Sequence, residues 1–353
     1  MANTAYNNYV NHTGMTVEQV KAIDLECRRY AQDAEKFWAQ FFDTAKWERG
    51  HKTFQHRKHI RPEVTYSTAT AMKLAEGYGA VKSNIKVVNW EETVDDYGTF
   101  IPYTAESIAY NIDDTLQLCK NQFSTLMVEV PEKCRANAIC TSNFTMAPAT
   151  VSDVVNYVAT FDKAKVILDK KLSKTINGYY IAIITPEIEA SLKAELRALG
   201  TSLDPVTKED VTREGTVYKF DKFLIVVRAD EAMYATVSNV NKQKIVFICK
   251  TRDNELPGSE ITPEFDIFDN GLGSGLVEAN TGSTDASPVY VADTNKREGS
   301  VAININHFGA GIQADLGHLV CVVDAATGYT PATQPSNDPI NGVANTSTAP
   351  VLS

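Results

Sequence analysis

Residues 51–61, HKTFQHRKHIR, constrain the fold more than any other stretch because they read as an extended strand without an apolar face. Side chains alternate between the two faces of a strand. One face would carry Lys52, Phe54, His56, Lys58 and Ile60, and the other His51, Thr53, Gln55, Arg57 and His59. Both faces mix polar and apolar groups, so we expect this strand to lie outside the core of its own chain.

The three histidines of this stretch, His51, His56 and His59, raise the question of a metal site. Zinc sites bring several His or Cys ligands to one ion. On a strand His56 points away from the other two, which lie roughly 26 Å apart at ~3.3 Å per residue. Because the three rings cannot share one ion, we predict neither a metal nor another cofactor for this chain.

The same stretch holds a local positive patch formed by Lys52, Arg57, Lys58 and Arg61. The whole chain is acidic, with 44 Asp and Glu against 34 Lys and Arg and a net charge of -10. That balance disfavours general binding to nucleic acid, which needs basic surface to neutralise phosphates. We therefore expect the patch to contact an acidic protein surface, with direct DNA contact as the alternative.

Size and composition are typical of a globular protein. The chain has 353 residues, of which 43% are hydrophobic, and this length can bury a sizeable core without disulfides or metals. The six cysteines are widely and irregularly spaced, which indicates reduced thiols. No apolar run reaches the ~18 residues of a membrane helix, and the N-terminal residues do not resemble a secretory signal.

Hydrophobic periodicity divides the chain into helices and strands. The predicted helices span residues 15–47, 105–139, 152–173 and 186–199. The predicted strands span residues 51–61, 85–96, 179–184, 217–228, 244–250, 300–306 and 318–325. The first two strands can pair as a long hairpin through the turn glycines Gly77 and Gly79. The polar stretch 251–299 is expected to be a long insertion or surface loop, and the tail after 326 to lack regular structure.

Caps and breakers predict where several helices begin or end. Thr185 is well placed as an N-cap and Pro186 as a first helical residue, so the fourth helix is the best defined. Ser152 and Asp153 are expected to begin the third helix. Pro131 should kink or end the second helix, with a short continuation beyond it.

No constellation of residues in the sequence indicates catalysis. GLGSG at 271–275 lacks the Lys-Ser/Thr end of a phosphate-binding loop, and no GxSxG nucleophile motif occurs. The acidic pair Asp95 and Asp96 is followed by Tyr97 and Gly98, which fits a bend better than paired acid and base chemistry. We therefore predict that the protein is not an enzyme.

The order of several short segments resembles one known family. The segments are GHKTFQHRKHIRP at 50–62, LAEG at 74–77, DYGTFIPYT at 96–104 and YYIAIITPEIEASL at 179–192. Between and around them lie the predicted helices in matching order. This arrangement resembles the major capsid proteins of tailed bacteriophages with the HK97-like fold. The resemblance covers roughly residues 45–250, with a weaker match at 300–325.

The resemblance implies an α+β fold with named parts. They are an N-terminal arm (1–47), an extended loop (48–104), a peripheral domain with a long spine helix (105–178), an axial domain (179–300) that includes the polar insertion 251–299, a return to the peripheral domain (301–325) and a C-terminal tail (326–353). The spine helix would be the predicted helix at 105–139 or the one at 152–173, and we favour the first. The extended loop would be a hairpin lying over a neighbouring subunit, which needs no apolar face of its own.

The resemblance also implies a structural function. Copies would self-assemble into hexamers and pentamers of an icosahedral phage head enclosing double-stranded DNA. Partners would be further copies, portal and scaffolding proteins, a decoration protein in some cases, and packaged DNA without sequence-specific binding. Lys52, Arg57, Lys58 and Arg61 of the extended loop would form inter-subunit contacts. Assembly would occur in the bacterial cytoplasm, the product would be the virion capsid, and no membrane would be involved.

Two alternatives remain at this stage. An encapsulin-like compartment has the same fold, although the arm and the long loop favour a virus. A soluble α/β enzyme or carbohydrate-binding module would need a pocket with convergent polar groups, which the sequence does not indicate.

Overall fold

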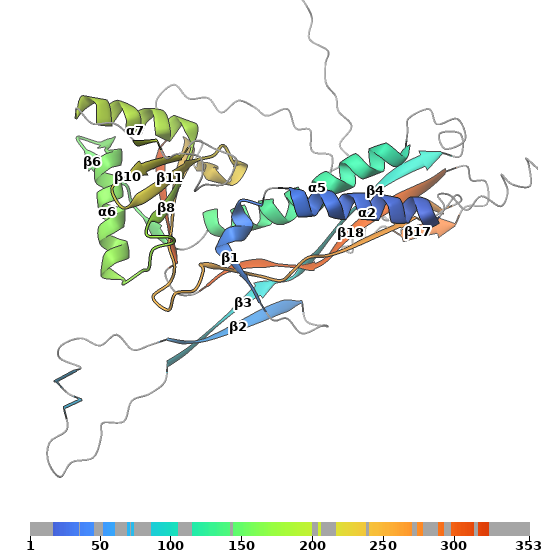
Figure 1. Cartoon of the computed structure of the whole chain (residues 1–353), viewed down its shortest axis with the longest axis horizontal. Helices are drawn as coiled ribbons and strands as arrows, with labels where there is room; N and C mark the ends of the chain where they lie inside the picture. The colour runs from blue at the N-terminus through green and yellow to red at the C-terminus, as the bar shows by residue number, and fades with distance from the viewer. Residues whose placement is uncertain are drawn as a thin grey trace, which may run out of the picture.

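The computed structural model is elongated, with two packed parts and a projecting hairpin (Figure 1). The structure describes residues 17–34, 36–45, 52–60, 69–70, 72–73, 86–104, 115–141, 144–199, 204–205, 217–237, 240–269, 274–277, 289–292, 298–313 and 317–324. Its helices are α2 (Val17–Asp33), η1 (Trp38–Phe41), α5 (Thr115–Cys140), α6 (Tyr157–Lys170), α7 (Pro186–Ala198) and η2 (Glu231–Met233).

The first part is built on an eight-stranded sheet with the order β5-β20-β13-β8-β11-β10-β9, in which β12 pairs with β13. Its strands are β5 (Thr145–Met146), β8 (Tyr180–Ile184), β9 (Asp204–Pro205), β10 (Val217–Phe220), β11 (Phe223–Val227), β12 (Tyr234–Val237), β13 (Val240–Ile248) and β20 (His318–Asp324). Strands β8 and β11 are parallel, whereas β13 is antiparallel to both β8 and β20. The chain therefore returns to this sheet with β20, which lies between β5 and β13.

Helices cover both faces of the eight-stranded sheet. On one face α6 and α7 pack against the strands, and Phe161, Leu168 and Phe247 belong to the buried cluster there. On the other face the C-terminal end of α5 and η1 supply Ile139 and Trp38 to a second cluster. Because it is covered on both faces, β8 is buried at every position, which explains its continuous apolar sequence.

The second part has α2 and α5 packed together against a three-stranded sheet of order β15-β18-β4 (Figure 1). The strands are β4 (Asp95–Thr104), β15 (Glu264–Asp269) and β18 (Glu298–Phe308). The shared cluster includes Ile23 and Cys27 of α2, Phe123 and Met127 of α5, and Ile303 of β18. Since α5 contributes to the clusters of both parts, this helix joins them.

Four smaller sheets complete the described structure. They are β1 (Phe42–Thr44) with β14 (Gly258–Glu260) and β19 (Ala310–Ile312), β2 (Thr53–Ile60) with β3 (Lys86–Thr93), β6 (Thr150–Val151) with β7 (Val154–Val155), and β16 (Ser274–Val277) with β17 (Val289–Ala292). The antiparallel pairing of β2 with β3 confirms that the two predicted strands pair, whereas the expected turn at Gly77 and Gly79 lies outside the described residues. The predicted N-cap of α7 is also confirmed, because the Thr185 hydroxyl accepts a hydrogen bond from Ile188 N at 3.4 Å.

The first predicted helix, over 15–47, is wrong in its second half. Helix α2 ends at Asp33, and the chain continues as η1 and the short strand β1. The reason lies in the packing: Ile23 of α2 is buried against the first half of α5, whereas Trp38 and Phe41 are buried against the eight-stranded sheet. Because the helix breaks between α2 and η1, α2 can pack on α5 while η1 packs on the eight-stranded sheet.

The predicted start of the third helix is also wrong. Ser152 and Asp153 have φ values of 49° and 64° and form the turn between β6 and β7. Helix α6 begins at Tyr157, and its N-cap is Asn156, whose side chain accepts a hydrogen bond from Ala159 N at 2.8 Å. Ser, Asp and Asn suit both turns and caps, so the sequence alone placed the cap too early.

Two further local predictions can be compared with the structure. Helix α5 continues through Pro131 to Cys140, which confirms the predicted continuation and excludes an end at Pro131. The predicted strand over 217–228 is two antiparallel strands, β10 and β11, joined by a turn at Asp221 and Lys222. The positive φ of Asp221, 51°, marks this turn.

The polar stretch 251–299 is not simply a surface loop. Within its described residues, β14 pairs with β1 and β19, and β15 pairs with β18 along six residues.

The grouping of elements also differs from the expected domain limits. Helix α6 packs on the eight-stranded sheet rather than with α5. Of the three strands that fall in 301–325, β18 joins β4, β19 joins β14 and β20 joins β13.

Candidate functional site

The hairpin β2–β3 projects from the packed parts of the structure (Figure 1), and it is the longest of the three described sheets whose two strands pair only with each other. The register runs from Thr53 opposite Thr93 to Ile60 opposite Lys86. An isolated two-stranded hairpin is marginally stable in water. Its base must therefore be held by the rest of the chain.

A small apolar cluster holds the base of the hairpin. Phe54 is buried, with 1% of its surface exposed, and packs with Val94 and Ile261 and against Ala45. The backbone hydrogen bond from Val94 N to Lys52 O, at 2.8 Å, closes the ladder at this end. The cluster explains why Phe54 alternates with polar residues in the sequence: its ring anchors the hairpin to the body.

Two glycines beyond β18 let the hairpin base approach closely. A Cβ at Gly309 would lie 2.7 Å from Thr93 O, and a Cβ at Gly311 would lie 2.0 Å from the Glu92 side chain. Glu92 accepts a hydrogen bond from Ile312 N at 3.4 Å. Burial raises the pKa of the Glu92 carboxyl, and this hydrogen bond offsets part of the rise. A side chain at either position would displace Thr93 or the Glu92 side chain, so only glycine fits at these contacts.

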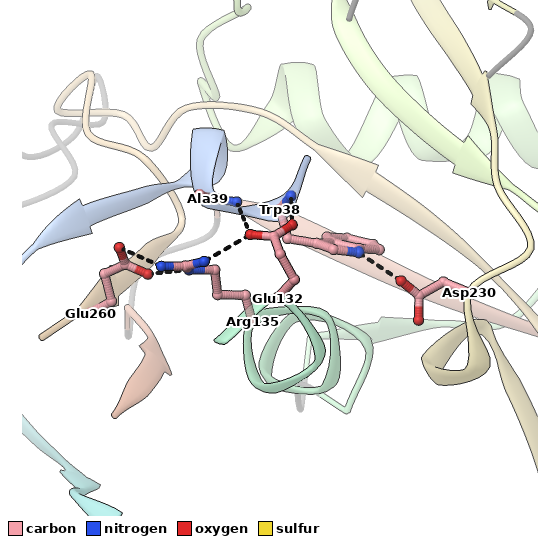
Figure 2. A network of polar contacts seen from close by, with 6 residues as sticks. All are labelled: Trp38, Ala39, Glu132, Arg135, Asp230 and Glu260. Atoms are coloured by element: carbon pink, nitrogen blue, oxygen red, sulfur yellow. Dashed lines mark hydrogen bonds and ion pairs between the residues drawn. The ribbon is translucent and has the colours of Figure 1, made fainter. Parts of the chain in front are cut away.

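A network of polar contacts centred on Arg135 lies at the C-terminal half of α5 (Figure 2). Arg135 of α5 donates from Nη1 to Glu132 at 2.7 Å and from Nη2 to Glu260 of β14 at 3.1 Å, and its Nε also contacts Glu260. Glu132 accepts hydrogen bonds from the backbone N of Trp38 at 2.7 Å and of Ala39 at 3.2 Å. The network therefore links α5, β14 and η1.

Paired carboxylates offset the cost of burying the charge of Arg135. Only 5% of Arg135 is exposed. Burial acts to lower the pKa of Arg135, but the hydrogen bond and charge of Glu260, with those of Glu132, raise it above its ordinary value. Trp38 adds a further link by donating from Nε1 to Asp230 Oδ2 at 2.8 Å. The charged groups of this network are therefore paired within the chain, and the network carries no free nucleophile or proton donor.

Hollows lie along α5, next to the hairpin base. One, of about 550 Å³, is lined in part by Glu92, Tyr97, Cys134 and Asn137. The Cys134 thiol and the Tyr97 hydroxyl lie 3.4 Å apart, and burial raises the pKa of both groups. A thiol with a raised pKa is a poor nucleophile. Burial therefore keeps the Cys134 thiol protonated instead of activating it.

The four predicted contact residues lie on the hairpin or just beyond it. Lys52 is exposed immediately before β2. Arg57 and Lys58 belong to β2, opposite Asn89 and Val88, but their side chains lie outside the described residues. Arg61 is itself outside them. The structure therefore places two of the four in β2 and a third directly before it, and the side-chain partners of these residues are not defined.

The metal and membrane predictions can be compared only with the described residues. His56 and His59 lie in β2, without described side chains, and His51 is outside the described part. Among described residues there is no group of three or more His, Cys, Asp or Glu that could hold a metal ion. No described helix combines the length and apolar character needed to cross a bilayer.

Sequence analysis missed the buried network entirely. Arg135 and Glu260 are 125 positions apart, and no local pattern indicates such a pair. The only signal is the spacing of three between Glu132 and Arg135, which places both on one face of a helix. That spacing is common on exposed helices and does not by itself indicate a buried joint.

Comparison with known proteins identifies the fold. No family model and no curated protein matches the chain. Among solved structures, the head of Helicobacter pylori bacteriophage KHP40 is 11% identical with a TM-score of 0.52, covering 79% of this chain and 86% of that one. The mature capsid of bacteriophage PhiM1 is 9% identical with a TM-score of 0.51, covering 84% and 89%. The protein therefore has the α+β, HK97-like fold of phage capsid structures.

Proposed function

We propose that the protein is the major capsid protein of a tailed bacteriophage, whose copies form hexamers and pentamers that close into an icosahedral head around double-stranded DNA. The observation that carries the proposal is the hairpin β2–β3, which has no other strand partner in the described structure, on a chain with a phage-capsid fold. A monomeric protein gains nothing from such a projection. A shell subunit gains a contact with its neighbour.

The named parts of the fold are assigned as follows in this proposal. Residues 1–47 are the N-terminal arm, whose helix α2 packs on the peripheral domain. Residues 48–104, with β2, β3 and β4, are the extended loop. Helix α5 is the spine helix of the peripheral domain, which includes β15 and β18. The eight-stranded sheet with α6 and α7 is the axial domain, to which the chain returns at β20. This division follows the packing clusters instead of the uninterrupted sequence ranges that we expected.

Shell stability in this proposal comes from the number of contacts per copy. Each contact is weak by itself, but a subunit held by several neighbours dissociates only when all are broken. The buried Arg135 network supports this role because it keeps the hairpin base, α5 and η1 in one fixed arrangement. A rigid base lets the hairpin reach its neighbour without losing conformational freedom at that moment.

Further partners follow from the family resemblance. We propose that assembly takes place in the bacterial cytoplasm with a scaffolding protein and a portal, and that the final location is the virion capsid. Packaged DNA would face the inner wall without sequence-specific contacts, which suits the net charge of -10. A decoration protein on the outside is a further partner to be tested.

The test is electron microscopy of the chain expressed alone and together with the products of neighbouring genes. We expect capsomer rings or closed icosahedral shells, and DNA inside shells that are recovered from infected cells. Shells that enclose a protein cargo and never DNA would support an encapsulin-like compartment instead. A compact monomer under all of these conditions would contradict the proposal.

A further inference from the structure

The C-terminal end of α6 has an unusual residue at its cap. Leu172 N donates to Asp169 O and Ser173 N donates to Leu168 O, both at 3.1 Å, and Leu172 has a φ of 58°. This is the hydrogen-bond pattern of a Schellman cap, whose left-handed position is usually occupied by glycine. A leucine there is strained. It is not compensated by burial either, since 58% of its surface is exposed.

Shortly after this cap, Lys174 is paired with Lys250, a residue of the same charge. Lys174 and Lys250 form an antiparallel bridge, with hydrogen bonds of 3.0 Å from Lys174 N to Lys250 O and 2.8 Å in return. Residues opposite each other in such a bridge project to the same side, where like charges destabilise the pair. Neither ammonium group forms an ion pair with a described residue.

Two other lysines in this region, unlike Lys174 and Lys250, have ion-pair partners within the chain. Lys165 is paired with Asp221 at 2.5 Å, and Lys222 with Asp169 at 2.9 Å, so their charges are balanced within the chain. Lys170 and Lys171, at the end of α6, form no ion pair with any residue that the structure describes. Three lysines within two positions of the exposed Leu172, together with Lys250 across the bridge from Lys174, therefore have no ion-pair partner among the described residues.

One more apolar residue extends this surface. Val166, 50% exposed, lies one turn before Lys170 on the same side of α6. The α6-end patch is thus an apolar centre with a cationic rim, formed by Val166, Lys170, Lys171, Leu172, Lys174 and Lys250. An apolar anchor inside a polar rim is the anatomy of a protein interface. Binding of a nucleic-acid backbone gives no reason for a strained, exposed leucine.

The charge of the chain indicates which protein the patch fits. Each copy carries a net charge of -10, so copies repel one another unless cationic surfaces meet anionic ones. We propose that the α6-end patch docks on an acidic surface of a second copy of this chain, with Leu172 as the apolar anchor. The inference rests on the proposed shell function, because it requires copies in contact.

The first test is Leu172→Gly, which separates assembly from folding. Glycine relieves the strained cap, so the melting temperature of the unassembled chain should stay the same or rise. The yield of capsomers or shells should fall at least fivefold because the anchor is lost. The matched control is Leu199→Gly at the end of α7, where the leucine is 65% exposed but has an ordinary φ of −85°. That control should assemble normally.

The second test is Lys174→Glu, which places opposite charges across the bridge. The unassembled chain should be no less stable than the wild type, whereas shell yield should fall at least fivefold. The control is Lys21→Glu, the same charge change at an exposed position of α2, which should assemble normally. Opposite effects on folding and assembly are not expected of a residue with a purely structural role.

The outcomes separate the two proposals. Wild-type shells together with unimpaired assembly of Leu172→Gly and Lys174→Glu would overturn the patch and leave the shell function standing. Failure of the wild type to form any assembly would overturn both. A photo-crosslinking residue at position 174 identifies the partner: a crosslink to an acidic peptide of a second copy supports the proposal, and a crosslink to DNA overturns it.

Discussion

Arg135 of α5 and Glu260 of β14 form a two-point ion pair in the interior of the protein, with Nη2 and Oε1 3.1 Å apart and a second contact from Nε. The pair joins the helix that spans both parts of the molecule to the small sheet next to the hairpin base (Figure 2). Two-point pairing of Arg with a carboxylate fixes orientation as well as distance. The position of the hairpin relative to α5 therefore depends on this contact.

Removal of one member of this pair should be costly. Arg135→Ala leaves Glu260 buried without its partner, and we expect the free energy of unfolding to fall by about 3–5 kcal/mol. Chemical denaturation of the unassembled chain measures this. The control is Asp24→Asn, which removes an exposed partner of Arg28 and should change stability by less than about 1 kcal/mol. An Arg135→Ala chain as stable as the control would show that the joint contributes little.

The glycine contacts at the hairpin base should differ in their tolerance of a methyl group. Gly309→Ala meets the Thr93 carbonyl, which cannot move without shifting β3, and we expect a loss of about 1–3 kcal/mol. Gly311→Ala meets the Glu92 side chain instead, so Glu92→Ala should relieve it. Thermal denaturation of the two single variants and of the Glu92→Ala, Gly311→Ala double variant tests this. No relief in the double variant would contradict the assignment.

His318 should make the protein sensitive to acid. Burial lowers the pKa of His318 to about 4, and neither ring nitrogen has a hydrogen-bond partner among the described residues. The unfolded chain therefore takes up a proton first as pH falls below about 6.5. Stability is complete above that value and declines toward pH 4, by on the order of 3 kcal/mol.

The measurement is the free energy of unfolding of His318→Leu and wild type at pH 7 and pH 4.5. The variant should lose less stability than the wild type between these two values. Phe144→Leu is the control, because it removes a ring 5.5 Å from His318 without removing a titratable group. Equal pH dependence of wild type and His318→Leu would show that another group governs the acid response.

The basic residues of the hairpin should affect assembly and not folding. Reversal of Arg57 and Lys58 to Glu places negative charge where we expect an acidic surface of the next copy. Shell yield should drop several-fold, and raised salt should partly restore it because salt screens the repulsion. Unchanged yield in low salt would show that these two residues do not form the contact. The melting temperature of the unassembled chain serves as the folding control.

Local chemistry allowed some of the fold to be predicted and misled elsewhere. Thr185 and Pro186 identified the start of α7 because a cap and a first-turn proline act within four residues. The β2–β3 hairpin followed from two extended runs around turn glycines. Ser152 and Asp153 misled because the same side chains suit a tight turn.

Other features depend on distant parts of the chain. In β15, the partly buried Phe265 and Ile267 alternate with the exposed Glu264 and Asp266, a strand pattern that the surrounding polar residues obscured. The Arg135 joint needs Glu260, which only the tertiary fold brings near. The strain at Leu172 is likewise a backbone property that no sequence pattern indicates. Such features account for most of what the sequence did not predict about the site.

The most direct test of the central claim is a cryo-electron microscopy reconstruction of the particles that the chain forms. We predict a closed icosahedral lattice of hexamers and pentamers in which the hairpin of each copy, strands β2 and β3, lies against the adjacent copy. A reconstruction in which the hairpin contacts only its own chain, or a sample that holds only monomers, would contradict the account.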